Sequence, residues 1–262
     1  MRLDVYLVEN HYFESRNKAA SSVKSGNFTV NGTQVFKPAY EVSVKDTVAV
    51  LRNEPVYVAR SAHKLVHAFK VFDLDWKNKT AADLGASTGG FCQVLLENGI
   101  RKIYAIDIGT AQLHPSIKTN PRVINLEHTN ARYLTAESFF EPIDVITADL
   151  SFISLKAVLP AIYHTLVDNG DAIVLIKPQF EAGPAHLNKS GVVTERKIQA
   201  KVLQEIAEFA LNLGFSISGI AFSGLAGESG NREYLLYLRK SHDISICVAE
   251  AVKAAVNGEG EG

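Results

Sequence analysis

The chain has 262 residues, of which 47% are hydrophobic and 21% charged, enough for one large α/β domain or for a medium domain with a small partner. Its formal net charge of −1 excludes a globally basic protein, so any nucleic-acid site must be a local patch. Two cysteines, Cys92 and Cys247, argue against a disulfide framework or a zinc site, and no segment approaches the roughly 18 consecutive apolar residues of a membrane helix.

Residues 1–52 are predicted to form a small α+β domain. Apolar residues at helical spacing, including Leu3 and Leu7, predict a first helix. Ser15 is placed to cap a second helix over residues 16–25, and Gly26 to end it. Four basic residues lie on or beside these helices: Arg2, Arg16, Lys18 and Lys24.

Two short β segments follow these helices. They lie around residues 28–30 and 42–51, with an Asn31-Gly32 turn between β-type runs. The next segment, residues 53–60, contains Pro55 and is predicted to be a linker.

Residues 61–240 are predicted to form the larger, α/β domain, because strand and helix patterns alternate along them. The expected strands cover residues 80–84, 102–107, 123–127, 145–149 and 172–176. The expected helices cover residues 90–98, 155–167 and 194–213. Such alternation indicates a parallel sheet that is covered by helices on both faces.

The end of this domain departs from the alternation. The last two expected strands, 215–222 and 233–239, are joined without a helix and are therefore predicted to pair antiparallel at the sheet edge. A seven-stranded sheet that is mostly parallel, with an antiparallel last strand, favours a Rossmann-like methyltransferase over a dinucleotide-binding domain. Residues 241–262 are expected to form a weak helix over 245–256 and a flexible tail.

A glycine-rich turn follows the first strand of the larger domain. It contains Gly85, Ala86, Ser87, Thr88, Gly89, Gly90 and Phe91 and opens the next expected helix. Backbone N–H groups there can approach a ligand at a helix N-terminus, although the spacing does not fit the dinucleotide fingerprint. Asp83, just before the turn, suits a ligand with a cationic amino-acid part, such as S-adenosylmethionine. An ordinary tight turn without a ligand is the alternative.

Charged residues end four of the expected strands. Asp83, Asp107, Asp149 and Lys177 all fall at carboxyl ends, where doubly wound sheets bind their ligands. Asp107 is placed to take the two ribose hydroxyls of a nucleoside cofactor. Each carboxylate by itself is explained by a solvated strand end, but the four together predict a site.

Two further residues complete this pattern. Lys64 lies on the helix before the first strand of the larger domain, and Glu233 starts its final strand. The order Lys64, Asp149, Lys177, Glu233 resembles the Lys-Asp-Lys-Glu tetrad of ribose 2′-O-methyltransferases in the FtsJ group. A structural salt bridge is the alternative reading of these four side chains.

The N-terminal segment resembles the small RNA-binding domain named after ribosomal small-subunit protein S-four. The resemblance implies that Arg2, Arg16, Lys18 and Lys24 belong to an RNA-binding face, and a solvated helix face explains the same charges equally well. Over roughly residues 1–240 the chain resembles the TlyA family, in which such a domain precedes an FtsJ-like methyltransferase domain. The segments that carry the resemblance are residues 83–91, 148–152, 177–181 and 230–234.

The resemblance implies 2′-O-methylation of cytidine in ribosomal RNA, with S-adenosylmethionine as the methyl donor and ribosomal RNA or ribosomal subunits as the partner. It implies that Lys64, Asp149, Lys177 and Glu233 form the catalytic group. No metal is needed for methyl transfer, and the eight histidines give no ligand spacing. Lys177 is expected either to orient the hydroxyl as a charged group or to act as a neutral general base.

Three more residues are candidates for ligand contacts. Asn130, after the third strand, is a candidate for the adenine side of the cofactor, or for a loop turn. Phe180 is a candidate for stacking on an RNA base, or for packing within the protein. Lys189, in a segment without periodicity, is a candidate for RNA binding.

Other functions are weighed against methyl transfer. The family is often labelled haemolysin, but the sequence shows no spanning segment, no signal-peptide core and no strongly basic amphipathic helix, so we expect a cytoplasmic protein without stable membrane association. An RNA-binding protein with an inactive methyltransferase domain is a further alternative. An NAD-dependent oxidoreductase is disfavoured by the glycine spacing.

Overall fold

A computed structural model describes residues 1–24, 26–51, 57–227 and 230–258 of the chain. Contacts divide the chain into two compact units, Met1–Val56 and Tyr57–Gly262. Part of the expected linker, residues 53–56, and the last residues of the expected tail, 259–262, lie outside the described residues. Each unit is described by itself.

The N-terminal unit packs two helices on a small antiparallel sheet. Its elements are α1 (Leu3–Glu9), α2 (Arg16–Lys24), β1 (Phe28–Val30), β2 (Thr33–Val35) and β3 (Val48–Val50), and its sheet order is β2-β1-β3. Ser15 caps α2, because its Oγ accepts the N–H of Lys18 at 3.4 Å. The apolar faces of the helices and of the sheet meet in one core around Leu3, Leu7, Val23 and Phe28.

The sheet of this unit differs from the expected one. β2 was missed, although Asn31 (φ 53°) and Gly32 (φ 80°) form the two-residue turn that joins it to β1. The expected strand over 42–51 shrinks to β3, residues 48–50. The physical reason is that Val42 pairs its backbone with Met1 at the start of the chain and not with β1.

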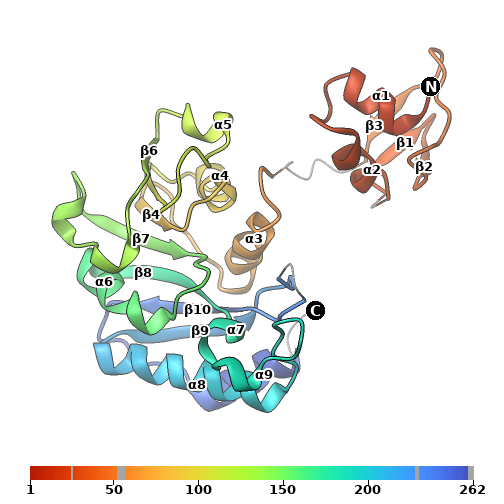
Figure 1. Cartoon of the computed structure of the whole chain (residues 1–262). Coiled ribbons are helices and arrows are strands. Elements are labelled where there is room, and N and C mark those ends of the chain that lie inside the picture. The colour runs from red at the N-terminus through yellow and green to blue at the C-terminus, as the bar shows by residue number, and fades with distance from the viewer. Residues whose placement is uncertain (25, 52–56, 228–229, 259–262) are drawn as a thin grey trace. The chain divides into compact units, whose positions relative to one another are not determined.

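The second unit is a seven-stranded sheet between two layers of helices (Figure 1). The strands are β4 (Thr80–Leu84), β5 (Lys102–Ile106), β6 (Val123–Leu126), β7 (Ile143–Ala148), β8 (Leu166–Ile176), β9 (Ser216–Phe222) and β10 (Tyr234–Arg239). Their order is β6-β5-β4-β7-β8-β10-β9. β10 runs antiparallel to both neighbours and the remaining pairs are parallel, so the predicted fold class is confirmed.

Helices cover both faces of this sheet. The helices are α3 (Ala62–Val71), α4 (Gly90–Glu97), α5 (Pro115–Lys118), α6 (Leu159–Thr165), α7 (Pro178–Glu181), α8 (Arg196–Leu213) and α9 (Val248–Asn257). Residues of α3, α4 and α5 share one apolar cluster with Ala81, Ile103 and Leu175 of the sheet. Residues of α6, α8 and α9 share the other cluster, with Ala82, Ile146 and Val174. Successive apolar residues of each central strand therefore point to opposite faces of the sheet and belong to two separate cores.

The segment 155–167 does not form the single helix that was predicted. A 3₁₀ turn at Leu155–Ala157 precedes α6, and Leu166 already belongs to β8, which is longer than the predicted 172–176. The polar residues in the middle of β8 have the composition of a turn. They instead form an irregularity where the register of the pairing with β7 shifts, and Asn169 adopts a φ of 61° there.

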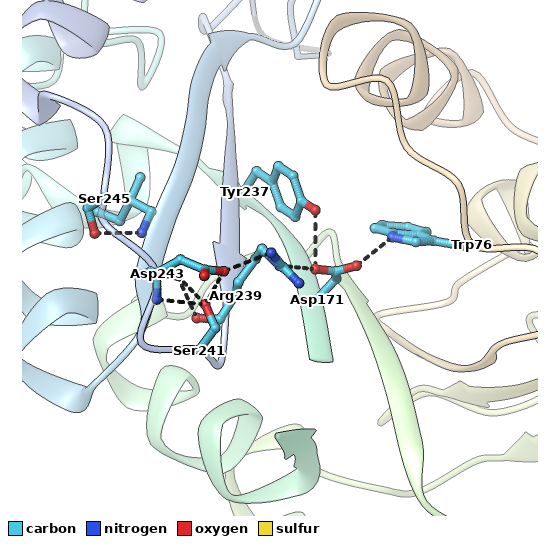
Figure 2. Close-up of polar contacts among 9 residues, drawn as sticks. Trp76, Asp171, Tyr237, Arg239, Ser241, Asp243 and Ser245 are labelled. Atoms are coloured by element: carbon cyan, nitrogen blue, oxygen red, sulfur yellow. Dashed lines mark hydrogen bonds and ion pairs between the residues drawn. The ribbon is translucent and has the colours of Figure 1, made fainter. Parts of the chain in front are cut away.

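A polar cluster lies where the pairing of β8 with β10 ends, at Asp171 in the middle of β8 and Arg239 at the end of β10 (Figure 2). Asp171 accepts hydrogen bonds from Trp76 Nε1 at 3.0 Å, Tyr237 Oη at 3.1 Å and Arg239 Nε at 3.1 Å. Arg239 also donates to Asp243 at 2.8 Å. We call Trp76, Asp171, Tyr237 and Arg239 the Asp171 cluster.

Candidate active site

The glycine-rich turn brings β4, α4 and the end of β7 together. Gly85 has a φ of 78°, and a Cβ on it would stand 2.9 Å from the carbonyl oxygen of Asp149. Gly89 has a φ of 92° and precedes the first turn of α4. A Cβ on Gly90 would stand 2.9 Å from the Cβ of Ala59. These glycines are therefore required by close backbone approach and by left-handed geometry.

Asp83 is placed differently from the expectation. Its carboxylate is buried behind the turn, where it accepts hydrogen bonds from Thr147 Oγ1 at 2.8 Å and Cys92 Sγ at 3.2 Å. Burial raises the pKa of Asp83 to about 6, and the charges of Asp149 and Asp107 add to that rise. Asp83 therefore connects β4 to β7 and α4 beneath the glycine-rich turn, and it does not line the cavity described next.

Asp107 and Asn130 are held by their own loops. Asp107 accepts the backbone N–H groups of Ser87 and Gly109, each at 2.8 Å, and thereby ties the loop after β5 to the glycine-rich turn. Asn130 Oδ1 accepts the N–H of Arg132 at 3.1 Å as the cap of a 3₁₀ turn. Of the two roles weighed for Asn130, the structure displays the loop-turn role.

The four tetrad residues meet at the carboxyl ends of the central strands. Lys64 Nζ lies 2.6 Å from Glu233 Oε2 and 3.2 Å from Asp149 Oδ2. Lys177 Nζ lies 2.6 Å from Asp149 Oδ1 and donates to Ser151 Oγ at 3.0 Å. The ion pairs therefore run in the order Glu233, Lys64, Asp149, Lys177, although the four residues are scattered over 170 positions of the sequence.

The charges of this buried cluster are balanced. Lys64, Lys177 and Glu233 are 6%, 8% and 3% exposed, so an unpaired charge at any of these positions would carry a large desolvation cost. Burial opposes the charge of Lys64, but the carboxylates of Asp149 and Glu233 outweigh it and raise the pKa of Lys64. Two ammonium groups and two carboxylates cancel, so that the site as a whole is neutral.

A cavity of about 890 Å³ opens beside the tetrad. Backbone and side chains of the glycine-rich turn line one part of it: Gly85, Ala86, Ser87, Thr88 and Phe91. The tetrad, Ser151, Gln179 and the aromatic rings of Phe152 and Phe180 line another part. The volume is of the size that holds a nucleoside-like ligand together with part of a second substrate.

The predicted RNA-binding residues fall into two groups. Phe180 packs against Phe152 with ring centroids 5.0 Å apart, and the exposed Lys189 lies between the lining residues Leu187 and Ser190. The other four lie in the N-terminal unit. There Arg2 and Arg16 both pair with the buried Asp4, at 2.9 and 3.0 Å, and Lys18 pairs with Glu14 at 2.9 Å, whereas Lys24 lies in the last turn of α2.

Sequence reasoning missed several residues that the structure brings to the site. Ser151 and Gln179 stand inside the quoted segments but were not singled out, and Gln179 Nε2 donates to Glu233 Oε1 at 3.2 Å. Phe152 is 90% exposed at a φ of 61°, which is uncommon for a bulky residue. These residues lie within three positions of Asp149 or Lys177 in the sequence, and that closeness is the signal that could have identified them. For Thr147 and Cys92, which hold Asp83, the sequence carries no such signal.

The sheet order, the glycine-rich turn and the tetrad at one cavity define the class of FtsJ-like methyltransferases. Residues 57–240 match the family of FtsJ-like methyltransferases, and residues 1–48 match the S4 domain. The chain is 40% identical to the 16S/23S rRNA (cytidine-2′-O)-methyltransferase TlyA of Mycobacterium tuberculosis, over 98% of this chain and 96% of that protein. This chain therefore belongs to the TlyA family.

Other proteins are similar to this chain over all or part of its length. Hemolysin A of Brachyspira hyodysenteriae is 37% identical over 90% of this chain and 99% of its own length. A solved structure from Streptococcus thermophilus, named as a candidate hemolysin, superposes with a TM-score of 0.76 at 36% identity and covers 100% of this chain and 96% of that one. A methyltransferase structure from Listeria monocytogenes, with a TM-score of 0.51 and 19% identity, shares the fold over 68% of this chain and 97% of its own.

Proposed function

We propose that this chain transfers a methyl group from S-adenosylmethionine to the ribose 2′-oxygen of a cytidine in ribosomal RNA. The observation that carries the proposal is the convergence of Lys64, Asp149, Lys177 and Glu233 on one cavity beside the glycine-rich turn. The relative from Mycobacterium tuberculosis, named for this reaction on 16S and 23S rRNA, supports the choice of cytidine.

The glycine-rich turn fits the methyl donor. Gly85 leaves space in front of the Asp149 carbonyl that a side chain would fill, and Ala86, Ser87 and Thr88 face the cavity. These residues would hold the donor, with Phe91 beside them. Asp107 would contact the ribose of the donor if its carboxylate accepted a ribose hydroxyl in place of the Ser87 N–H. Otherwise it would act by ordering the glycine-rich turn. When bound, the donor supplies a methyl group that its sulfonium already activates.

Lys177 would orient the acceptor hydroxyl. Its ammonium has three N–H donors, forms an ion pair with Asp149 and donates a hydrogen bond to Ser151, which leaves a donor for an oxygen in the cavity. Because Asp149 stands against it, we assign Lys177 as a charged group that orients and polarises the 2′-hydroxyl. Correct placement of that oxygen is worth several kcal/mol of the barrier.

The other members of the tetrad would hold Lys177 in position, and their carboxylates could accept the proton of the acceptor hydroxyl. Lys64 stays protonated between two carboxylates and fixes Asp149 from the side opposite Lys177. The hydroxyl proton leaves late, to a carboxylate of the tetrad or to water. The competing assignment makes a neutral Lys177 the general base.

The RNA is proposed to cross the same edge of the sheet. Phe180, paired with Phe152, would stack on a base, and Lys189 would contact the backbone of the RNA. In the N-terminal unit, Arg2, Arg16, Lys18 and Lys24 would contribute phosphate contacts, although Arg2 and Arg16 also stabilise the buried Asp4.

The experiment is methyl transfer by the full chain with radiolabelled S-adenosylmethionine. Small and large ribosomal subunits, whole particles and naked rRNA, all from a strain that lacks this gene, are offered separately, and the product is mapped for 2′-O-methyl groups. We expect label at a cytidine ribose. Saturating donor that binds without any transfer would indicate an RNA-binding protein with an inactive domain and would overturn the proposal.

The name of the Brachyspira relative raises a membrane-lytic alternative. Among the residues that the structure describes, no helix is both long and apolar enough to cross a bilayer. Dye release from liposomes by purified, detergent-free protein is therefore the second arm of the experiment. Release at the concentrations that support methyl transfer would add a lytic activity, and we expect none.

A further inference from the structure

Glu181 connects two segments that each carry a tetrad residue, the loop after β7 with Asp149 and the start of α7 with Lys177. It is the last residue of α7, the short helix that follows Lys177. Its Oε2 accepts Ser154 Oγ–H and its Oε1 accepts the Leu155 N–H, both at 2.7 Å. These two donors belong to the loop that follows Asp149. One carboxylate therefore ties the loop after β7 to the helix after β8.

The tied loop carries the groups that face the acceptor. Ser151 receives a hydrogen bond from Lys177, and Phe152 packs on Phe180 of α7. Phe152 is 90% exposed and adopts a φ of 61°, in the left-handed region that bulky side chains avoid. Such a backbone persists where its surroundings hold it, and it is typical of binding sites. The contacts of Glu181 lie two and three residues beyond it.

The other contacts of Ser154 and Leu155 do not replace this tie. Ser154 Oγ accepts the Lys156 N–H at 3.2 Å and so caps the 3₁₀ turn locally, and the buried Leu155 side chain anchors the turn to the core. Both interactions stay within the turn or below it, and neither reaches α7. Burial raises the pKa of Glu181, while the hydrogen bonds from Ser154 and Leu155 work against that rise. The two hydrogen bonds therefore offset only part of the effect of burial on this carboxyl group.

We propose that Glu181 is a positioning residue for the acceptor nucleotide. By fixing the 150–155 loop against α7, it keeps Ser151 on Lys177 and Phe152 beside Phe180, so that the hydroxyl and the base are presented together. The inference rests on the proposed function, because it assigns the acceptor to this side of the cavity. Glu181 touches neither the tetrad nor, in this assignment, the substrate.

The test is steady-state kinetics of Glu181→Ala and Glu181→Gln in the full chain, with the RNA substrate on which the wild-type chain is active. For Glu181→Ala we expect the KM for RNA to rise and kcat to fall, each about tenfold, because a small misplacement of reacting groups is costly. The affinity for S-adenosylmethionine should stay within about twofold, since the glycine-rich turn follows a different strand. Glu181→Gln should restore most of the activity, because its oxygen can accept the Leu155 N–H while its amide donates to Ser154.

Glu205→Ala is the matched control. Glu205 pairs with Lys156 of the same 3₁₀ turn at 3.3 Å but does not reach the 150–155 backbone, so its removal should leave both constants near the wild-type values. A double-mutant cycle with Phe152→Ala adds a readout that a merely structural role would not move. If Glu181 acts through this loop, Glu181→Ala should cost much less in the Phe152→Ala background than in the wild type.

The outcomes are separable. A wild-type chain without transferase activity defeats the proposed function, whereas an active wild type with unchanged kinetics in Glu181→Ala defeats this inference. Additive losses in the cycle also overturn it. Should Glu181→Ala fail to fold or to bind S-adenosylmethionine, Ser154→Ala decides, because it removes one of the two bonds and should raise the KM for RNA by a smaller factor of the same sign.

Discussion

Two partly buried charge clusters lie at opposite ends of the segment over which β8 and β10 pair, which runs from Ile176 and Tyr234 to Asp171 and Arg239. At one end, Lys177 and Glu233 belong to the tetrad, which lines the cavity and leaves a lysine donor available. At the other end, the two carboxylate oxygens of Asp171 accept hydrogen bonds from three donors. Among the described residues that line the cavity, none belongs to the Asp171 cluster. The difference teaches that a free hydrogen-bond donor beside a cavity, and not buried charge as such, distinguishes the end that we propose to be reactive.

Lys177→Ala should have the largest effect on activity. We expect methyl transfer to fall by about 10³-fold or more, because the group that orients the hydroxyl is lost. Asp149 keeps Lys64 as its partner, so the chain should still fold and bind S-adenosylmethionine, which calorimetry can check. Lys156→Ala, a surface lysine paired with Glu205, is the control and should remain active. Near-normal transfer by Lys177→Ala would remove the distinction between the two ends.

Asp171→Asn should do the reverse, with loss of stability and little loss of catalysis. An amide cannot satisfy Trp76, Tyr237 and Arg239 together, so we expect the free energy of unfolding to drop by about 2 kcal/mol. The rate of methyl transfer per folded molecule should change by less than about twofold, since the substituted group is remote from the cavity. Denaturant unfolding and initial rates on the same preparation check both parts.

The same variant has a spectroscopic readout. Burial raises the pKa of Tyr237 to about 12, and the charge and hydrogen bond of Asp171 add to that rise. Asp171→Asn should therefore lower this pKa, though not to the ordinary value, because burial is the larger cause. Alkaline difference absorbance against Tyr237→Phe isolates the signal. An unchanged titration would contradict the coupling.

Asp83→Asn should change how the stability of the protein depends on pH. A carboxyl pKa raised to about 6 means that the folded state holds its proton more tightly than the unfolded state, so stability falls as pH rises through the interval from about 4 to 6. Replacement by Asn removes this term. Between pH 5 and 7.5 the stability of the variant relative to the wild type should therefore increase by roughly 1.4 kcal/mol. Parallel pH dependences of the two proteins would refute the buried ionisation.

Lys18→Ala should have the smallest effect. Lys18 is half exposed in the N-terminal unit, and its partner Glu14 is exposed too, so stability should hardly change. If this helix contacts phosphates, RNA affinity should weaken about twofold to threefold and the salt slope should decrease by about one ion. Glu14→Ala, which removes the competing carboxylate, is the matched variant and should strengthen binding. An affinity that ignores both changes would limit Lys18 to a surface ion pair.

Much of the architecture could be predicted because local sequence controls it. The strand Thr80–Leu84 and the start of α4 at Gly90 follow from an apolar run and a glycine turn, and the structure has both where they were expected. The extension of β8 to Leu166 could not be predicted, because pairing with Ile143 overrides the turn-like polar residues in its middle. Asp83 was expected to face a ligand, but its partners Thr147 and Cys92 come from β7 and α4 and were not visible in the pattern.

The sequence by itself determined the alternation of strands and helices, the glycine-rich turn and the identity of the four charged residues that end up together. Tertiary structure decided which of those charges touch: that Lys64 bridges Glu233 and Asp149, and that Lys177 reaches Ser151. The reason is that apolar periodicity is a property of neighbours along the chain. Ion pairs across 85 and 169 positions exist only once the sheet order has brought distant strand ends side by side.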